Sequence, residues 1–306
     1  MPTILGIDSA SIDNNEPPNW TAAKAPSSDG SRLQFAILRG TYGDWVDTDF
    51  LRDFAGLKAA GIARGAYMYP TFKNGQGKLV TPDALVAALL RGLSQAGYEA
   101  GKDLPPAIDI ESAGSPTAFG QSAATAMQWY ERIYDLLKAE FGIAPMIYTS
   151  GRVWREDLDN LMTDMIDCPL WLAKPWPWKI RTPAQRSITQ AFSSGAYDPE
   201  VPIPWGGGNA WIHQYQGDSL GWPGIERPAK QPGQVDCNRF LLAFKGQKGA
   251  RVKWIQRRVG VAVDGDFGTQ TQQAVKNFQK SKGLLDDGIV GIATFAPLCW
   301  TKPSAS

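Results

Sequence analysis

Short apolar runs alternate with longer amphipathic stretches along the first 240 residues of the chain. Each apolar run is long enough for one buried strand and too short for a typical helix. The runs predict strands at residues 4–8, 34–39, 65–70, 106–111, 145–149, 170–173 and 211–215. Some of the stretches between them carry apolar side chains at helical spacing and stop at a glycine. These stretches predict helices at residues 50–61, 82–97 and 119–141.

Strands that alternate with helices are typical of a parallel sheet covered by helices. So many strands within about 240 residues favour closure of the sheet over an open one. The predicted fold class for residues 1–244 is therefore α/β, an irregular TIM-like barrel. In such barrels the active site lies at the carboxyl ends of the strands.

The chain changes character after residue 244. Residues 245–249 read Lys-Gly-Gln-Lys-Gly and predict a linker. Beyond it the pattern DGxxGxxT occurs twice, beginning at Asp264 and at Asp287. Each copy predicts a tight Asp-Gly turn followed by the start of a helix. We therefore expect a small all-helical domain at residues 250–300.

Composition describes a globular protein of 306 residues, 43% hydrophobic and 20% charged. No apolar run approaches the roughly 20 residues of a membrane span, so we expect no membrane partner. The first residues predict a strand and lack the basic start and long apolar core of a signal peptide. We therefore expect a protein made in the cytoplasm that another agent must release if its substrate lies outside.

The net charge of +1 hides an asymmetry between the two parts. Residues 245–306 carry ten Lys or Arg and four Asp or Glu, a net charge of +6, whereas residues 1–244 carry 21 and 26, a net charge of −5. A basic tail on an acidic body indicates either an anionic partner for the tail or ordinary surface charge. The basic residues do not cluster on one predicted helix, which disfavours a nucleic-acid partner. We expect a monomer.

Cysteine and histidine usage excludes several kinds of site. Cys168, Cys237 and Cys299 lie far apart without CxxC spacing, so they predict neither a disulfide framework nor a zinc site. His213 is the only histidine, which excludes a His-based metal cluster and disfavours a Ser-His-Asp triad. We expect neither a cofactor nor a metal.

Two acids, Asp109 and Glu111, stand two residues apart at the end of a predicted strand. In a strand they would share one face, and their mutual repulsion would raise the pKa of at least one of them. A protonated acid beside an ionised one suits the cleavage of a glycosidic bond. Asp8 also ends a predicted strand, and Asp236 follows the last one by a loop. Solvated acids at strand ends are the plainer alternative, but a barrel would gather all four at one mouth.

Residues 174–209 form the longest irregular stretch and contain Trp176, Trp178 and Trp205. A loop of this length inside a compact domain is usually functional. Its tryptophans could stack on sugar rings or pin the loop to the barrel, and the sequence leaves both open.

Seven motifs in a fixed order resemble those of glycoside hydrolase family 25, the Chalaropsis-type lysozymes, over residues 1 to about 242. They are Gly6-Ile7-Asp8-Ser9, Gly65-Ala66-Tyr67, Pro105-Pro106-Ala107-Ile108-Asp109-Ile110-Glu111, Pro145-Met146-Ile147-Tyr148-Thr149, Pro169-Leu170-Trp171-Leu172-Ala173, Trp211-Ile212-His213-Gln214-Tyr215 and Val235-Asp236-Cys237-Asn238-Arg239-Phe240. Residues 250–298 resemble the helical type 1 peptidoglycan-binding domain, which carries the doubled DGxxGxxT pattern. Two unrelated modules that point to one polymer support each other.

The resemblance implies an endolysin-like lysozyme. Such an N-acetylmuramidase cuts the β-1,4 bond between N-acetylmuramic acid and N-acetylglucosamine in bacterial peptidoglycan with retention of configuration. Glu111 would be the general acid and base. Asp109 would be the nucleophile or would orient the substrate's own acetamide, and both routes stay open. Asp8 and Asp236 would control the hydrogen bonds and charge of the acid pair. The resemblance further implies substrate contacts from Tyr67, Tyr148, Trp171, Trp211 and Gln214.

Two segments depart from the family pattern, residues 39–43 and the loop at residues 174–209, which is longer than usual. Residues 39–43 read Arg-Gly-Thr-Tyr-Gly where many members have a Lys-Ala-Thr-Glu-Gly-like segment, so an acid is absent there.

A chitinase-like hydrolase and a non-catalytic wall-binding protein remain alternatives, although a non-catalytic barrel would be expected to lose one of the four acids. A phage endolysin released by a holin and a bacterial autolysin exported by another route would share these features. Either would act on the bacterial cell wall.

Overall fold

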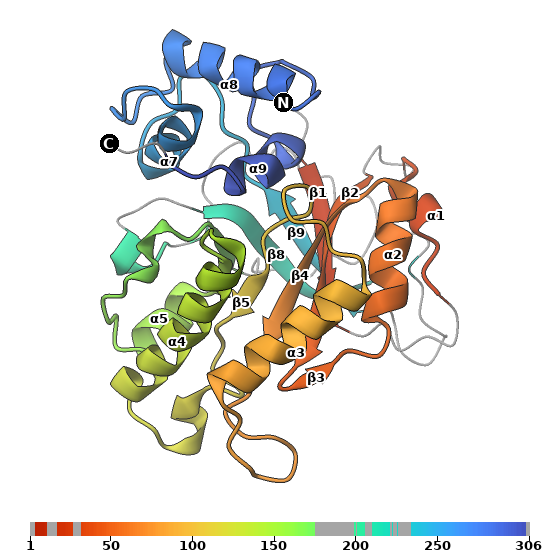
Figure 1. The fold of residues 1–306 in the computed structure, drawn as a ribbon, viewed down its shortest axis with the longest axis vertical. Helices are drawn as coiled ribbons and strands as arrows, with labels where there is room; N and C mark the ends of the chain where they lie inside the picture. Colours follow the sequence, from red (N-terminus) through yellow and green to blue (C-terminus); the bar gives the residue numbers. More distant parts are fainter. Residues whose placement is uncertain are drawn as a thin grey trace.

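The computed structural model describes residues 4–10, 17–26, 32–174, 199, 201–205, 210–220, 222, 225 and 234–303. Within these residues, eight strands close into a ring in the order β1-β9-β8-β7-β6-β5-β4-β2, and β2 pairs with β1 (Figure 1). Their bounds are β1 Ile4–Ser9, β2 Leu33–Tyr42, β4 Ala63–Tyr69, β5 Ala107–Asp109, β6 Met146–Thr149, β7 Leu170–Ala173, β8 Ala210–Leu220 and β9 Gln234–Phe240. Neighbours in the ring are parallel, except that β9 runs antiparallel to β1 and β8. The predicted irregular barrel is confirmed.

Helices cover the outside of the ring. They are α1 Trp20–Lys24, α2 Phe50–Ala60, α3 Pro82–Gln95, α4 Ala123–Phe141 and α5 Gly151–Glu156, with short 3-10 turns at Pro116–Phe119, Met165–Asp167 and Ile203–Trp205. The Thr81 hydroxyl caps α3 by accepting from the Ala84 N–H, and Gly61 ends α2 in a left-handed conformation. Buried apolar side chains of these helices form a shell against the outer face of the strands.

Three differences from the prediction bear on the site. The helix expected from residue 119 begins at Ala123, because Gly120 ends a separate 3-10 turn and Ser122 caps the new helix. The strand expected at 106–111 ends at Asp109. Asp236 does not follow the last strand by a loop but lies inside β9, a strand that the sequence pattern does not predict. Polar residues point into the barrel from β9, so an apolar run does not mark this strand.

The barrel has two ends, which we call the mouth and the floor. The mouth is formed by the carboxyl ends of the parallel strands. The floor is apolar and contains the buried side chains of Phe35, Met146, Ile212 and Phe240. Gly6 is required here, because a Cβ at this position would lie 2.4 Å from the Phe35 ring.

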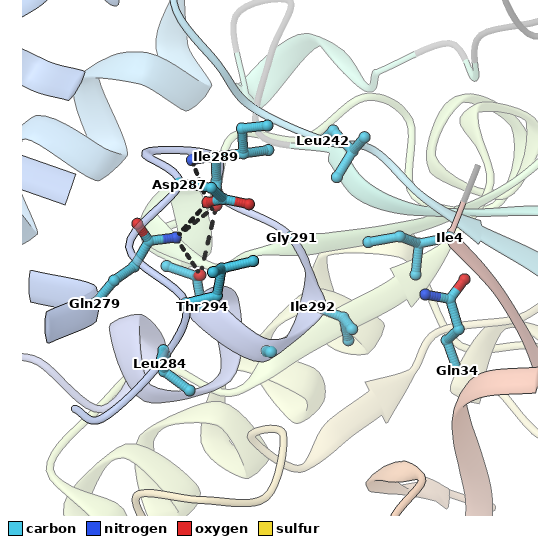
Figure 2. Close-up of a pocket in the computed structure, with 12 residues that line it drawn as sticks. Ile4, Gln34, Leu242, Gln279, Leu284, Asp287, Ile289, Gly291, Ile292 and Thr294 are labelled. Carbon is cyan, nitrogen blue, oxygen red and sulfur yellow. Dashed lines mark hydrogen bonds between the residues drawn. The ribbon is translucent and has the colours of Figure 1, made fainter. Parts of the chain in front are cut away.

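The tail, residues 245–303, contains helices α7 Ala250–Val259, α8 Thr269–Ser281 and α9 Ile292–Cys299. Each copy of the DGxxGxxT pattern folds around a buried glutamine eight residues before its aspartate. Gln256 Nε2 donates to Asp264 Oδ1 at 2.7 Å and to Thr271 Oγ1 at 3.0 Å. Gln279 repeats these bonds with Asp287 and Thr294 (Figure 2). The aspartate and threonine of the repeat therefore hold the turn in place.

The tail covers the floor of the barrel, at the end opposite the β2–β3 hairpin, where β3 is Trp45–Val46 (Figure 1). The ring of Trp211, at the start of β8, lies 4.6 Å from that of Phe295 and 5.0 Å from that of Trp254. Phe240 at the end of β9 lies 5.3 Å from Phe295. These four aromatic side chains, which we call the seam, are buried in one cluster shared by both parts of the chain.

Polar contacts reinforce the seam. Arg251 Nη1 donates to the carbonyl oxygens of Ala210 and Leu241, both at 3.2 Å. Trp300 Nε1 donates to the carbonyl oxygen of Asp103 at 2.8 Å. A pocket of about 420 Å³ lies between the two parts, with Ile4 and Leu242 of the barrel facing the second repeat of the tail (Figure 2). The linker pattern of residues 245–249 indicates two separable parts, but the two parts share one core, so removal of the tail would expose the floor of the barrel. None of the described helices is long and apolar enough to cross a membrane.

Candidate active site

The structure brings the four predicted acids together at the mouth. Asp8 near the end of β1 stands opposite Asp236 of β9 in the strand register. Asp109 is the last residue of β5, and Glu111 follows it outside the strand. The intervening Ile110 N–H donates to the Tyr148 carbonyl at 2.8 Å, which ties this backbone to β6. Strand geometry therefore orients Asp109 but does not by itself place Glu111 on the same face.

Two buried amides, Gln214 and Asn238, hold Asp8 and Asp236. Gln214 Nε2 donates to Asp8 Oδ1 at 3.0 Å and to Asp236 Oδ2 at 3.2 Å. Asn238 Nδ2 donates to the same Asp8 oxygen at 2.6 Å. Because both amides donate a hydrogen bond to Asp8 from inside the barrel, the two amides can stabilise negative charge on Asp8.

Aromatic side chains orient the two amides in turn. The Tyr148 hydroxyl donates to Gln214 Oε1 at 2.9 Å, and Trp171 Nε1 donates to Asn238 Oδ1 at 2.8 Å. The Tyr148 and Trp171 rings pack edge to face, with centroids 4.5 Å apart. This network fixes which end of each amide points at the acids, so its donors are preorganised before a ligand arrives.

Burial and mutual repulsion set the charge state of the acids. Burial raises the pKa of Asp8, the neighbouring Asp236 raises it further, and the two amides lower it. Burial and then Glu111 and Asp8 raise the pKa of Asp109 well above its usual range. Not all four acids are therefore expected to be ionised together near neutral pH.

Asp109 also has an unpartnered atom. Its side chain is buried, and within the described part of the chain its Oδ1 accepts no hydrogen bond. An orphaned buried acceptor is costly and is found where a ligand supplies the missing donor. This oxygen is therefore a place for an N–H or O–H of a bound substrate.

Glu111 is the more accessible member of the acid pair. Burial raises its pKa, while the nearby Tyr148 hydroxyl and the positive charge of Arg152 lower it. A cavity of about 270 Å³ opens beside it, lined by Glu111, Tyr148, Thr149, Arg152 and Ala173 among others. An acid with a raised pKa at the wall of a cleft can donate a proton to a bound group.

The predicted substrate contacts separate into two sets. Tyr67, Tyr148, Trp171 and Gln214 lie at the mouth, but all are buried and hold other side chains in place. Trp211 does not lie there, because it is fully buried in the seam at the other end of the barrel. Trp211 and Gln214 are three positions apart, so a strand directs them to opposite faces, and this signal was present in the sequence.

The structure describes only part of the predicted tryptophan loop. Trp176 and Trp178 lie outside the described residues. Trp205 is buried, with its ring 4.7 Å from that of Trp154, so this tryptophan pins the loop to the barrel.

Asn238 was not among the predicted site residues, although it follows Asp236 at the two-residue spacing that puts both side chains on one face of a strand. No three His, Cys, Asp or Glu side chains in the described ranges are arranged to hold a metal ion.

The raised pKa of Asp109 predicts an unusual effect of Asp109→Asn on stability. The fold binds the Asp109 proton more tightly than the unfolded chain does, so stability falls as pH rises from about 3.9 through the raised folded value. Asparagine does not ionise, so the variant does not lose this stability as pH rises. Its amide can also donate hydrogen bonds to the neighbouring acids. We expect the variant to melt above the wild type at pH 7, by about 2 °C or more, and the gap to close near pH 4.

Scanning calorimetry across pH measures this difference. Asp83→Asn is the matched control, because Asp83 is exposed and pairs with Arg132 at the surface. The control should differ from the wild type by less than about 0.5 kcal/mol at every pH. An Asp109→Asn variant that melts below the wild type at pH 7 would show that the fold favours the ionised acid.

Comparison with known proteins agrees with the architecture. A bacterial lysozyme from Streptomyces coelicolor has a TM-score of 0.54 at 22% identity and covers 78% of this chain and 91% of its own, which supports the fold. Among curated relatives, the uncharacterized protein YegX of Escherichia coli K12 is 26% identical over 172 residues, 56% of each chain. The N,O-diacetylmuramidase of Chalaropsis is 32% identical over 102 residues, 30% of this chain and 48% of that protein. The chain spans about half the length of these curated relatives.

Two family models match the chain. Residues 248–298 match a putative peptidoglycan binding domain. Residues 7–200, more than half of the chain, match the glycosyl hydrolases family 25 and include Asp8, Asp109 and Glu111. The chain therefore belongs to glycosyl hydrolases family 25 and carries a C-terminal domain of the peptidoglycan-binding type.

Proposed function

We propose that this chain is a lysozyme, an N-acetylmuramidase that hydrolyses the β-1,4 bond between N-acetylmuramic acid and N-acetylglucosamine in bacterial peptidoglycan. The observation that carries the proposal is the acid pair at the mouth, in which both pKa values are raised and Asp109 keeps one acceptor free. Family membership supports a glycosidase, and the second domain supports peptidoglycan as its polymer.

Glu111 is the proposed general acid. It borders the cleft and has a raised pKa, so its protonated form persists to higher pH than that of an ordinary glutamate. As the bond between the sugar C1 and the leaving oxygen breaks, the Glu111 proton moves to that oxygen. The resulting carboxylate then takes a proton from the water that attacks C1, and the acid is restored.

Asp109 is the proposed partner of the substrate's acetamide. Its free Oδ1 can accept the acetamide N–H, and this bond would lower the pKa of Asp109 and favour its ionised form. The acetamide carbonyl oxygen then attacks C1 from the face opposite the leaving group, and water later opens the resulting ring. A covalent glycosyl adduct on Asp109, trapped with a 5-fluoro sugar that keeps its 2-acetamido group and located by peptide mass spectrometry, would contradict this route.

Asp8 and Asp236 act through the groups around them. Together with Gln214 and Asn238 they form a buried polar layer below the acid pair. Negative charge in this layer raises the pKa of Asp109. We assign these residues a positioning and electrostatic role rather than direct contact with the bond that breaks.

Arg152 offers a test of the Glu111 assignment through pH. Its charge lowers the pKa of Glu111, so Arg152→Met should raise that pKa. Because the general acid must be protonated, the alkaline limb of the kcat/KM profile should move to higher pH, by about half a unit or less for a partly exposed cation. Arg155→Met on the same helix is the matched control and should leave the limb in place. A shift to lower pH would contradict Glu111 as the acid.

Digestion of purified sacculi tests the proposed reaction. The full-length protein should lower turbidity and release soluble glycan fragments with new reducing ends. Free peptides without new reducing ends would indicate an amidase or peptidase instead. Intact sacculi that only bind the protein would favour the non-catalytic alternative, and hydrolysis of chitin in preference to sacculi would favour the chitinase-like one.

The tail is the proposed anchor on the wall. Its family model names peptidoglycan binding, and its excess of basic residues suits an anionic polymer. Attachment raises the local concentration of the barrel at an insoluble substrate without changing its chemistry.

A further inference from the structure

A row of three aromatic side chains crosses the rim of the mouth. Tyr42 of β2 stands directly opposite Trp45 of β3 on one side and Tyr69 of β4 on the other. Residues paired in this way point to the same face of a sheet. The Tyr42 and Tyr69 rings are stacked, with centroids 5.3 Å apart and planes at 3°. We call these three residues the aromatic row.

The row starts beside the acid pair. Met68 pairs with Ile108, so one further step of the register sets Tyr69 beside Asp109. The Tyr69 hydroxyl donates to the Ala113 carbonyl at 2.8 Å, in the segment that follows Glu111. Neighbouring strands lie about 4.8 Å apart, so Tyr42 is roughly 10 Å from the strand of Asp109, and Trp45 is farther out.

The outer part of the row faces solvent. The exposed fraction is 73% for Trp45 and 53% for Tyr42, and Phe119 at 40% is the other large aromatic residue of the described ranges that is exposed. Aromatic surface that is left open next to a cleft marks a binding site more often than chance exposure does.

The support of the row is rigid. Arg39 Nε contacts Asp47 Oδ2 at 2.6 Å, and the Arg39 guanidinium lies 5.3 Å from the Tyr42 ring centroid. Gly43 has φ +59°, and its N–H donates to the Tyr69 carbonyl at 2.9 Å. A ring fixed before binding loses little conformational entropy when a ligand stacks on it.

We propose that the aromatic row is a saccharide-binding platform that takes a pyranose ring of the glycan strand at a distance from the bond that is cut. The C–H face of a pyranose is apolar and matches an aromatic ring, while its hydroxyl edges remain free for hydrogen bonds. The platform continues the proposed active site outward, and this inference rests on the proposed function. It makes the enzyme respond to the length of the glycan.

Glycan strands stripped of their peptides and sorted by length test the platform. The measurement is the ratio of kcat/KM on long strands to that on the shortest strand the wild type cuts. Tyr42→Ala and Trp45→Ala should each lower this ratio by about three- to tenfold, the effect of losing one ring contact. Tyr42→Phe keeps the ring and should retain most of the ratio. Phe119→Ala removes an exposed ring outside the row and should leave the ratio unchanged.

The outcomes distinguish this inference from the proposed function on which it rests. Wild-type ratios in both alanine variants, with both strand lengths still cut, would overturn the platform and leave the muramidase proposal standing. The same two variants losing activity only on strands that retain peptides would assign the row to the peptide and overturn it as a saccharide platform. A wild-type protein that cuts no strand of either length would overturn the proposed function itself. Trp45 is largely exposed, so its variant should keep the wild-type melting temperature.

Discussion

Glu111→Gln is expected to lower kcat on peptidoglycan by about 10²- to 10⁴-fold, the usual cost of losing a general acid. Glutamine keeps the shape of the side chain and its contact with Tyr148, but it cannot donate a carboxylic proton. Each tenfold loss corresponds to about 1.4 kcal/mol of transition-state stabilisation. Because the substitution also removes one of four mutually repelling acids, the melting temperature should not fall.

Turbidity assays on sacculi and a thermal melt of the same sample measure both effects. Glu140→Gln provides the matched control, since Glu140 is an exposed acid on α4 that does not line the cleft. The control should keep activity within a small factor of the wild type. A well-folded Glu111→Gln protein that clears sacculi at the wild-type rate would remove Glu111 from the mechanism.

Loss of the seam is expected to destabilise the whole chain rather than the tail alone. Phe295 is fully buried between Trp211 and Phe240 of the barrel and Trp254 of the tail. Phe295→Ala should lower the free energy of unfolding by about 3–5 kcal/mol, the range for a buried phenylalanine. Deletion of residues 246–306 removes two of the four seam residues and should leave a barrel that aggregates or melts well below the full chain.

Chemical denaturation followed by tryptophan fluorescence measures the loss. Leu285→Ala is the control, because Leu285 is 79% exposed on the same tail and should cost less than about 0.5 kcal/mol. The full chain should unfold in one transition that reports both parts. A barrel of residues 1–245 that keeps the wild-type melting temperature and full turnover of soluble glycan would show that the two parts are independent.

The arrangement of the acids could be predicted from the sequence because it depends on local pattern. Asp8 and Asp109 each end a short apolar run, and parallel strands bring such ends to one mouth. The role of the two amides could not be predicted in the same way, although the family resemblance named Gln214 as a substrate contact. Gln214 and Asn238 matter because they meet Asp8 from strands that neighbour each other in the ring, and periodicity does not reveal which strands are neighbours.

The position of the tail could not be predicted from the sequence for a different reason. Trp254 and Phe295 lie on helices whose apolar faces could equally pack within a small independent domain. The sequence predicts those faces but not their partner surface. Only the floor of the barrel, where Trp211 lies at the start of β8 and Phe240 at the end of β9, shows that the two cores merge. Trp211 was therefore assigned to the substrate groove when it belongs to the seam.

The identity of the bond that is cut tests the account most directly. Purified sacculi are digested with the full-length protein, the fragments are reduced with borohydride, and mass spectrometry locates the reduced sugar. We predict reduced N-acetylmuramic acid in the wild-type digest and none above background in the Glu111→Gln digest. Reduction at N-acetylglucosamine, or equal amounts of reduced muramic acid in both digests, would contradict it.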